Sequence, residues 1–443
     1  MWLTQGDESK KLSQEPSIDG GDWNDVEWTI DVDRNDRDQS ILGFGAALSN
    51  SAAYLFHNSP SKTEILNDLF GADGIGISYI RLVMGGSDFN AVEPYTYDDI
   101  ESGDDFDMSQ FSIDKDQEFV IPVLRDILAI NPNVKILATP WSAPAWMKNP
   151  RSLNGGRLRN DGAILEALAE YFVRFIQAYD DEGITIDAVT LQNEPEHASG
   201  GYPTMQMSWQ EQRDLIRDHL GPKLADAQLN TDIILWDHNW DNPGFSIDIL
   251  NDAGAKQYIA GSGFHCYAGD KNAPQQVKNA HPDKDIYFTE CSGGEWDTNF
   301  GSGFGWNLQN LFIGQTRVSS RNVLLWNLAL DENYGPREGV TAGCSDCRGV
   351  VTIPSWGGYD RNVEYYSIGH FSKFVPEGSI KIGTNNFGDN LESVAFETPE
   401  GKVVVVVLNT WWDGEKTFQV NIDGQFYRVD NLPGRSAVTL VQN

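Results

Sequence analysis

Short apolar runs alternate with longer amphipathic stretches between about residues 41 and 330 of the chain. Eight runs have the length of a β-strand and are rich in β-branched residues: 41–49, 77–84, 134–142, 186–194, 232–239, 263–267, 285–290 and 322–330. Their hydrophobicity is largely continuous, which is typical of parallel strands covered on both faces. The pattern therefore predicts eight buried parallel strands.

The stretches between these runs have helical spacing of their apolar residues. Residues 161–183 are one example, and this segment stops at Gly183, a common helix terminator. Residues 59–70, 208–228 and 362–375 have the same character. Eight strands that alternate with helical crossovers predict an α/β fold of the (β/α)8 TIM-barrel type. A doubly wound sheet is the structural alternative, but no GxGxxG motif follows the first strand.

The two ends of the chain differ from this middle part. From about residue 374, strand-like segments are joined by Gly, Asp and Pro turns, and residues 26–34 form one more strand-like segment near the N-terminus. We expect residues 40–373 to form the barrel, residues 374–443 to form a small all-β sandwich, and residues 1–39 to contribute to that sandwich.

The charge balance excludes some classes of partner. The formal net charge is −33 and the sequence pI is about 4.4, so the surface would repel nucleic acids and anionic membranes. No run of about 18 apolar residues predicts a membrane span, and no apolar signal core follows Met1. The chain is then either cytoplasmic or the mature form of a secreted protein.

Four cysteines are too few for a disulfide scaffold. Cys344 and Cys347 form a single CxxC, and a zinc site would need a second pair of ligands. A small loop disulfide or free thiols is the expectation here. Cys266 and Cys291 lie beside other candidate functional residues, and a zinc site with His265 is disfavoured because adjacent strand residues point to opposite faces.

Two glutamates lie at the ends of predicted strands. The fourth strand ends on Asn193 and Glu194, and the seventh ends on Glu290. In a (β/α)8 barrel these strands face each other across the mouth where active sites lie. Two opposed carboxylates are suited to glycoside hydrolysis, in which one attacks the anomeric carbon and the other protonates the leaving oxygen. Arg81, near the end of the second strand, is placed to keep a carboxylate such as Glu290 ionised.

Other interpretations of these residues remain open. Both glutamates could simply form salt bridges with barrel arginines. Glu196 is a rival for the acid, but Pro195 separates it from the strand end, so we expect a loop residue that contacts substrate at most.

The order of several motifs resembles glycoside hydrolase family 30, which contains glucosylceramidases and endo-β-1,6-glucanases. The motifs span about residues 40–376 and read GFGAALSNSAA, SYIRLVMGGSDFN, PYTYDD, ATPWSAPAWMKN, LQNEPEH, FHCY and YFTECSGGEW. The loop at residues 332–353 and the segment WDHNWD look more like the endo-β-1,6-glucanase branch. Asn50 and Cys291 also depart from the usual glucosylceramidase pattern.

The resemblance implies roles for individual residues. Glu194 would be the general acid/base and Glu290 the nucleophile, with Arg81 and Tyr267 holding the nucleophile and Asn193 binding the sugar 2-hydroxyl. Trp326 would form the platform under the sugar. The remaining candidates for substrate binding are Asp88, Trp141, Asp237, His238, His265 and Trp296. A satisfied core histidine is the alternative for His265, and core packing is the alternative for the tryptophans.

The sequence therefore predicts a secreted, retaining β-glycoside hydrolase that acts on β-linked glucan, most readily β-1,6-linked. The expected separation of the two carboxyl groups is about 5–5.5 Å, as retention requires. No cofactor and no metal ion is expected, and we expect a monomer. The alternatives are a glucosylceramidase, exo-β-glucosidase or β-xylosidase with the same machinery, and a carbohydrate-binding protein without catalysis.

Overall fold

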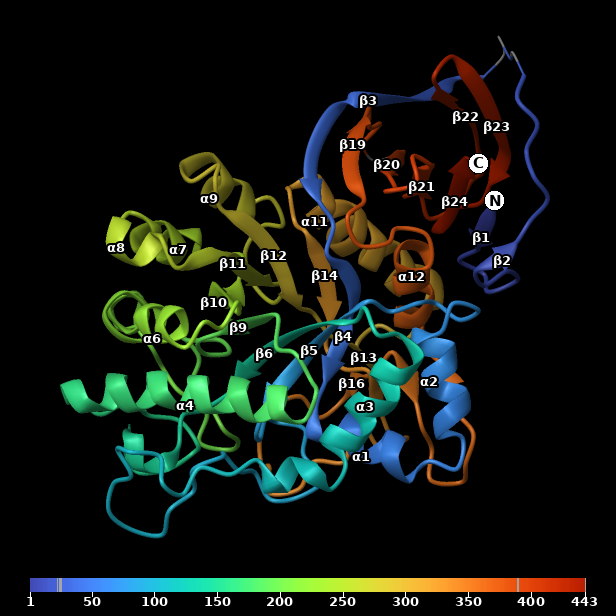
Figure 1. Ribbon diagram of the computed structural model, residues 1–443. Helices are drawn as coiled ribbons and strands as arrows, with labels where there is room; N and C mark the ends of the chain where they lie inside the picture. The colour runs from blue at the N-terminus through green and yellow to red at the C-terminus, as the bar shows by residue number, and fades with distance from the viewer. Residues whose placement is uncertain (22, 24–25, 389, 443) are drawn as a thin grey trace.

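The computed structural model describes residues 1–21, 23, 26–388 and 390–442. It has two parts, a (β/α)8 barrel and a β-sandwich that contains both chain termini (Figure 1). This confirms the predicted fold class. The boundaries at residues 40 and 374 stay a prediction.

Eight parallel strands form the barrel, in the order β12-β11-β10-β9-β6-β5-β4-β14. Backbone hydrogen bonds from Arg321 to Ile286 and from Trp326 to Cys291, both 2.9 Å, join β14 to the β12 side of the barrel. Most of the strand residues are buried on both faces, as the continuous apolar runs predict. The strands are β4 (Gly43–Leu48), β5 (Tyr79–Met84), β6 (Lys135–Pro140), β9 (Ala188–Thr190), β10 (Asp232–Asn239), β11 (Ile259–His265), β12 (Asp285–Glu290) and β14 (Asn322–Leu325).

Helices surround the barrel strands (Figure 1). The longest, α4, begins after Asp161, whose side chain accepts a hydrogen bond from the backbone N–H of Ala163 and so caps the helix. The helices are α1 (Asn50–Asn58), α2 (Lys62–Phe70), α3 (Val120–Ile130), α4 (Gly162–Asp181), α5 (Trp209–Asp214), α6 (Gly221–Asp226), α7 (Pro243–Leu250), α8 (Ala253–Lys256), α9 (Pro274–Ala280), α10 (Phe300–Trp306), α11 (Ile313–Arg317) and α12 (Val363–Ser372). π-helical turns Leu215–Leu220 and Asn307–Phe312 link α5 to α6 and α10 to α11.

Short elements in the loops complete the barrel part. They are the 3₁₀ turns Asp114–Gln117 and Ala145–Met147 and the strands β7 (Lys148–Asn149), β8 (Arg157–Leu158), β13 (Gly293–Gly294), β15 (Ala329–Leu330), β16 (Cys347–Arg348), β17 (Val351–Thr352) and β18 (Asp360–Arg361).

The sandwich strands come from both ends of the chain. Strand β3 (Trp28–Ser40) pairs antiparallel with β19 (Ile380–Thr384) and parallel with β22 (Lys416–Ile422), so the N-terminal segment lies within the sheet. The remaining strands are β1 (Trp2–Thr4), β2 (Ser13–Gln14), β20 (Leu391–Glu397), β21 (Val403–Asn409), β23 (Gln425–Leu432) and β24 (Ser436–Gln442).

A buried histidine joins the two parts. His370 on α12 is fully buried, and its two ring nitrogens lie 2.8 Å from the hydroxyls of Thr4 on β1 and Thr439 on β24. Burial lowers the pKa of His370 to about 3, so the ring is neutral at neutral pH. One imidazole thus ties both ends of the chain to the barrel.

All four cysteines form disulfides. Cys344 pairs with Cys347, which confirms one of the two expectations for this CxxC. Cys266 pairs with Cys291, a bond that the sequence analysis did not predict. The alternative of a zinc site built from His265, Cys266 and Cys291 is wrong, because both thiols are consumed by the disulfide.

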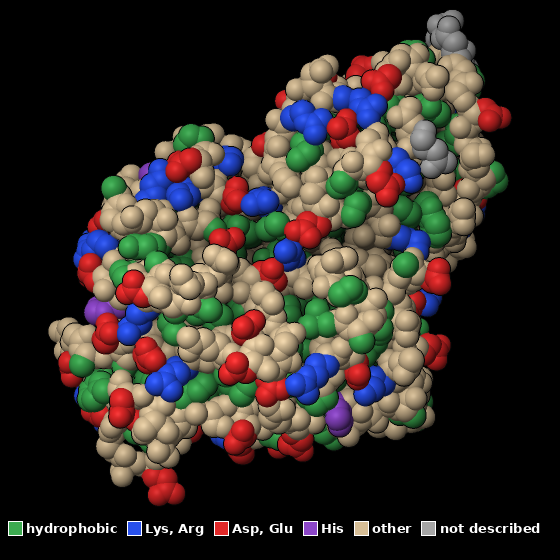
Figure 2. Space-filling model, in the orientation of Figure 1, with side chains coloured by type: hydrophobic (Ala, Val, Ile, Leu, Met, Phe, Trp, Pro, Cys, Tyr) green, Lys and Arg blue, Asp and Glu red, His purple; other side chains and the backbone are tan. Residues whose placement is uncertain are grey.

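The surface carries charges of both signs. Figure 2 shows acidic and basic side chains interspersed on one face of the molecule rather than gathered into a basic patch. No helix among the described residues is long and apolar enough to cross a bilayer.

Candidate active site

Glu290 and Glu194 reach the same barrel mouth in different ways. Glu290 is the last residue of β12. Glu194 lies beyond the end of β9, in a left-handed conformation with φ of 46°, so the predicted strand 186–194 is shorter than expected. The backbone N–H of Glu194 donates to the carbonyl of Asp237 at 3.0 Å, and that of Asn193 donates to the carbonyl of Pro140 at 2.9 Å. These bonds to neighbouring strands hold the loop that carries Glu194.

The two carboxyl groups are close together. One oxygen of Glu194 lies within 4.8 Å of one oxygen of Glu290. Inverting glycosidases separate their carboxyl groups by about 6.5–9.5 Å to admit a water, whereas retaining enzymes keep them about 5–5.5 Å apart. The observed proximity favours the retaining arrangement.

Arg81 holds Glu290 from below. The guanidinium is fully buried, and Nη1 lies 2.5 Å from Oε2 of Glu290. Its Nη2 donates to Asn193 at 2.7 Å and to Asp237 at 2.8 Å, and the group lies 4.8 Å from the ring centre of Trp141. A buried guanidinium with these partners stays charged and favours the ionised form of both carboxylates.

His265 links the remaining carboxylates. Its Nδ1 lies 3.2 Å from Oε1 of Glu194, and its Nε2 lies 3.0 Å from Oδ1 of Asp237. Burial alone lowers the pKa of His265, but the charge of Glu290 and the contacts with Asp237 and Glu194 raise it to about 9. The ring is therefore a cation at neutral pH. It is fully buried with partners on both nitrogens and does not line the pocket, so a role for His265 in binding substrate stays a prediction.

The surroundings act differently on the two glutamates. Burial of Glu194 opposes ionisation, but the hydrogen bond and charge of His265 outweigh it and lower the pKa of Glu194. Burial is the largest influence on Glu290 and raises its pKa, against the charges of His265 and Arg81. Asp237 is also buried, but Arg81 and His265 lower the pKa of Asp237 below its ordinary value. With Arg81 and His265 positive, and Asp237 and Glu290 negative, the buried group is neutral when Glu194 carries a proton.

Tyr267 approaches Glu290 from the solvent side. Its hydroxyl donates to Oε1 of Glu290 at 2.9 Å, and its backbone N–H donates to Asn239 Oδ1 at 3.1 Å. Each oxygen of Glu290 thus accepts a hydrogen bond, one from Arg81 and one from Tyr267, and both bonds favour the carboxylate form.

Both glutamates open into a pocket of about 580 Å³. Trp326 and Trp141 form one wall, with ring centres 5.0 Å apart and planes inclined by 32°. Asp88 also lines this pocket, and burial together with the charge of Glu290 raises the pKa of Asp88 to about 7. The Cys344–Cys347 loop borders the same pocket, and the backbone N–H of Cys344 lies 3.4 Å from Asp88 Oδ2.

The structure brings all twelve predicted site residues to this region. Nine line the pocket: Asp88, Trp141, Asn193, Glu194, His238, Tyr267, Glu290, Trp296 and Trp326. Arg81, Asp237 and His265 are fully buried behind them and contact the glutamates or one another. His238 is buried, and burial lowers its pKa to about 4, so it is neutral beside Glu194. Glu196 is exposed and accepts a hydrogen bond from Asn242, as expected of a loop residue.

Several residues of the pocket had no predicted role. Tyr202 and His197 line it and lie 2.9 Å apart, hydroxyl to Nε2. Both lie in the long loop after β9, where only proximity to Glu194 in the sequence could have indicated them. Thr190 donates to Asp237 at 2.8 Å and supports it from behind.

Glu194 and Glu290, together with His265, are also of the residue types that bind metal ions. Among the described residues, Glu194, His265 and Glu290 form the group of three ligand-type side chains whose atoms lie within 4.8 Å of one another. The Arg81 guanidinium already lies on Glu290, so the charge pattern favours a carboxylate pair over a metal centre. A larger hollow, about 720 Å³, lies between the N-terminal segment and β23 in the sandwich and contains none of the site residues.

Comparisons with known proteins agree with this geometry. The glycosyl hydrolase family 30 TIM-barrel domain matches residues 41–375, and the family 30 beta sandwich domain matches residues 378–440. The endo-1,6-beta-D-glucanase neg1 of Aspergillus fumigatus is 34% identical over 435 residues, which covers 93% of this chain and 87% of that protein. The lysosomal acid glucosylceramidase of Mus musculus is 31% identical over 394 residues, which covers 84% of this chain and 75% of that protein.

A solved structure shows the same likeness in three dimensions. The endo-beta1,6-glucanase BT3312 superposes with a TM-score of 0.90 at 32% sequence identity, and the match covers 99% of this chain and 97% of that one. The resemblance seen in the sequence motifs is confirmed, and the chain belongs to glycosyl hydrolase family 30 and is a glycoside hydrolase.

Proposed function

We propose that this protein is an endo-acting β-1,6-glucanase that hydrolyses its substrate with retention of configuration. The observation that carries the mechanism is the pair Glu194 and Glu290, whose carboxyl oxygens lie within 4.8 Å of each other. Of these two glutamates, Glu290 is the one that Arg81 and Tyr267 contact. The linkage is supported by the relatives, because neg1 and BT3312 are endo-β-1,6-glucanases.

In the first step Glu290 attacks the anomeric carbon. Arg81 and Tyr267 keep Glu290 ionised and fix its oxygens, while Glu194 transfers a proton to the departing glycosidic oxygen. In the free enzyme the His265 cation lowers the pKa of Glu194. A bound sugar covers the exposed part of Glu194 and removes water from it, which raises its pKa and favours the protonated form that this step requires.

In the second step water releases the sugar. The covalent ester removes the negative charge of Glu290, so Glu194 no longer has a like charge beside it and its pKa falls. Glu194 then acts as the base that deprotonates the incoming water. Asn193, held by Arg81 at 2.7 Å, is in place to bind the sugar 2-hydroxyl through its amide group.

The test is the time course of products from a linear β-1,6-glucan, with β-1,3- and β-1,4-glucans and an aryl β-glucoside alongside. We expect a ladder of β-1,6-linked oligosaccharides whose reducing ends form first as the β-anomer, which proton NMR detects. A first product with the α-anomer would refute the retaining mechanism. Glucose released only from the aryl glucoside, with all polymers intact, would replace the glucanase with a glucosylceramidase-like or exo-acting enzyme.

The roles of the two glutamates are tested by matched variants. Glu290→Gln should abolish turnover of every substrate and preserve sugar binding. Glu194→Gln should hydrolyse a glucan about 10²–10⁴-fold more slowly than wild type. It should retain the rate of the first step on a glucoside whose leaving group needs no proton. The outcome that contradicts the assignment is equal loss of that first step in both variants.

We also propose that the protein works outside the cell, as a monomer. The two disulfides support secretion, because such bonds persist in oxidising compartments and are rare in the cytosol. Thiol titration of the native protein should find no free cysteine, and light scattering should give a mass near 49.3 kDa. Four reactive thiols or a multiple of that mass would contradict these proposals.

A further inference from the structure

A second hollow, of about 300 Å³, lies beside the catalytic pocket. Tyr267, Ser292 and Trp296 line both spaces, so the two hollows are neighbours. The glutamates that we assign to catalysis do not line the second hollow. The walls of that hollow are Cys266, Tyr267, Cys291, Ser292, Gly293, Gly294, Trp296, Asp297, Gly303, Trp306, Asn307, Arg348 and Glu364.

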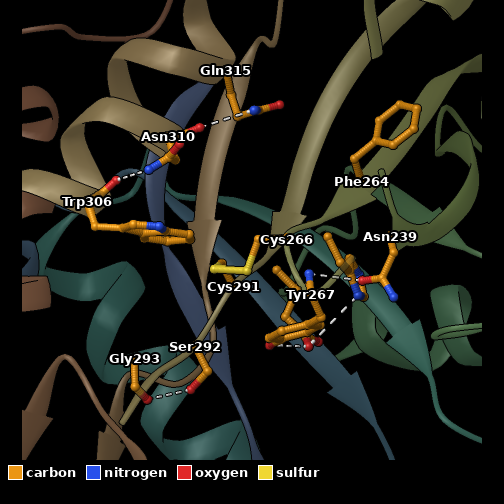
Figure 3. Close-up of a disulfide and its surroundings, with 12 residues drawn as sticks. Asn239, Phe264, Cys266, Tyr267, Cys291, Ser292, Gly293, Trp306, Asn310 and Gln315 are labelled. Atoms are coloured by element: carbon orange, nitrogen blue, oxygen red, sulfur yellow. Dashed lines mark hydrogen bonds and ion pairs between the residues drawn. A yellow bond between two sulfur atoms is a disulfide. The ribbon is translucent and has the colours of Figure 1, made fainter. Parts of the chain in front are cut away.

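Two exposed tryptophans flank this hollow. Trp296 is 58% exposed and Trp306 is 41% exposed, although large aromatic rings are usually buried. Trp296 lies against the backbone of Gly294, where a Cβ would come within 2.1 Å of the indole ring. Glycine at that position thus allows the indole to pack on the chain. Trp306 ends α10, and Figure 3 shows its indole directed toward the Cys266–Cys291 disulfide.

The disulfide connects this hollow to the catalytic residues. Cys266 lies between His265 and Tyr267, and Cys291 follows Glu290 directly. The bond therefore joins the ends of β11 and β12, and Tyr267 lies on its other side in Figure 3. A ligand in this hollow would be held at a fixed distance from Glu290.

Polar groups complete the walls. Arg348 and the buried Glu364 form a paired contact, with Nε–Oε2 of 3.1 Å and Nη2–Oε1 of 2.9 Å. Arg348 also donates to the carbonyls of Gly294 and Asp297, each at 3.3 Å. Open aromatic faces beside fixed hydrogen-bonding groups match the chemistry of a sugar ring, which is apolar on its faces and polar at its rim.

We propose that this hollow is a further subsite of the enzyme. It binds another glucosyl unit of the same glucan chain that is cleaved in the catalytic pocket, and Trp306 is the surface on which that unit stacks. This inference rests on the proposed glucanase function and extends it, because an endo-acting enzyme must hold several units of a polymer. The hollow adjoins the catalytic pocket, where the next units of a bound chain can reach it, so we take the continuing polymer rather than a separate ligand as its occupant.

The experiment compares Trp306→Ala with wild type on β-1,6-linked glucose oligomers of two to six units and on an aryl β-glucoside. We expect kcat/KM of Trp306→Ala to fall about three- to tenfold on the longest oligomers and to stay unchanged on the aryl glucoside. Trp306→Phe keeps a ring face and should recover part of the loss. Trp356→Ala is the matched control, since Trp356 is 76% exposed and lines neither hollow.

Two failures are distinguishable. If Trp306→Ala has the same kcat/KM as wild type on every oligomer that the wild type cleaves, the proposed subsite is wrong. If the wild type does not cleave β-1,6 oligomers, only the proposed linkage is refuted. The subsite is then tested by the same comparison of Trp306→Ala with wild type on β-1,3 and β-1,4 oligomers. If the wild type cleaves the aryl glucoside alone, no second glucosyl unit is used and the subsite falls as well.

Discussion

Asp237→Asn removes one charge from the buried group beneath the two glutamates. Asp237 accepts hydrogen bonds from Arg81 and Thr190 on one oxygen and lies 3.0 Å from His265 on the other. An asparagine of the same shape can still accept from Arg81 and Thr190. Its amide group then faces Nε2 of His265, which can no longer be protonated without placing two donors against each other.

Two magnitudes follow from this geometry. Removing one partner of a fully buried ion pair costs about 3–5 kcal/mol of folding free energy. In addition, the pKa of His265 rises from 6.5 to about 9 on folding, which at about 1.4 kcal/mol per pH unit stabilises the wild type by about 3 kcal/mol. The raised pKa fixes the sign: this stabilisation is complete below about pH 6.5 and is lost as the pH rises toward 9.

The assay is urea unfolding of wild type and Asp237→Asn at pH 6, 7.5 and 9. We expect the variant to have a lower free energy of unfolding than wild type at pH 6. This difference should narrow by about 1–2 kcal/mol by pH 9, because only wild type has a His265 cation stabilised by Asp237 and loses that stabilisation as the pH rises. Asp248→Asn, an exposed aspartate on α7, is the control and should show no gap. A gap that is constant with pH would refute the assignment of a protonated His265.

Three further changes test other contacts. Tyr267→Phe removes the 2.9 Å hydrogen bond to Glu290 and should lower kcat/KM about 10- to 100-fold without loss of fold, measured by steady-state kinetics and circular dichroism. His370→Gln removes a group whose pKa falls from 6.5 to about 3 on folding. A lowered histidine pKa costs stability as the pH falls, so the free energy of unfolding of wild type should drop by about 2 kcal/mol between pH 7.5 and 5, and urea unfolding of the variant should show no such drop. Replacing Cys266 and Cys291 together by alanine opens a loop of 25 residues and should cost about 3–4 kcal/mol in unfolding experiments, and an equal midpoint would contradict this.

The barrel could be predicted because its strands are apolar on both faces. Predicted and observed strands agree closely where the run is uninterrupted, as for 77–84 against β5 and 285–290 against β12. The sixth strand was placed too late, at 263–267, because Gly261 and Gly263 interrupt the apolar pattern of β11. Glycine allows close strand packing there but has no side chain that a pattern can reveal.

The site was predicted at the level of its residues but not of its contacts. Position at a strand end indicated Glu194 and Glu290, whereas the left-handed turn at Glu194 depends on backbone bonds to β6 and β10. The Cys266–Cys291 bond does have a signal in the sequence, because both cysteines directly follow the ends of strands that are adjacent in a barrel. The hollow beside Trp306 has no such signal, because it forms where α10 meets the segments after β11 and β12 together with Arg348 and Glu364, which are far apart in the sequence.

The position of β3 has a consequence for synthesis of the protein. Its partner β19 begins 340 residues after β3 ends, so at 5–20 residues per second the new strand waits about 20–70 s on the ribosome before it can pair. A lone strand with free edges would invite aggregation during that time. Strand β3 carries Asp31, Asp33, Arg34, Asp36, Arg37 and Asp38 among its 13 residues. These charges keep the waiting strand soluble, and replacing them with apolar residues would harm the yield of folded protein before it harmed the stability of the finished sheet.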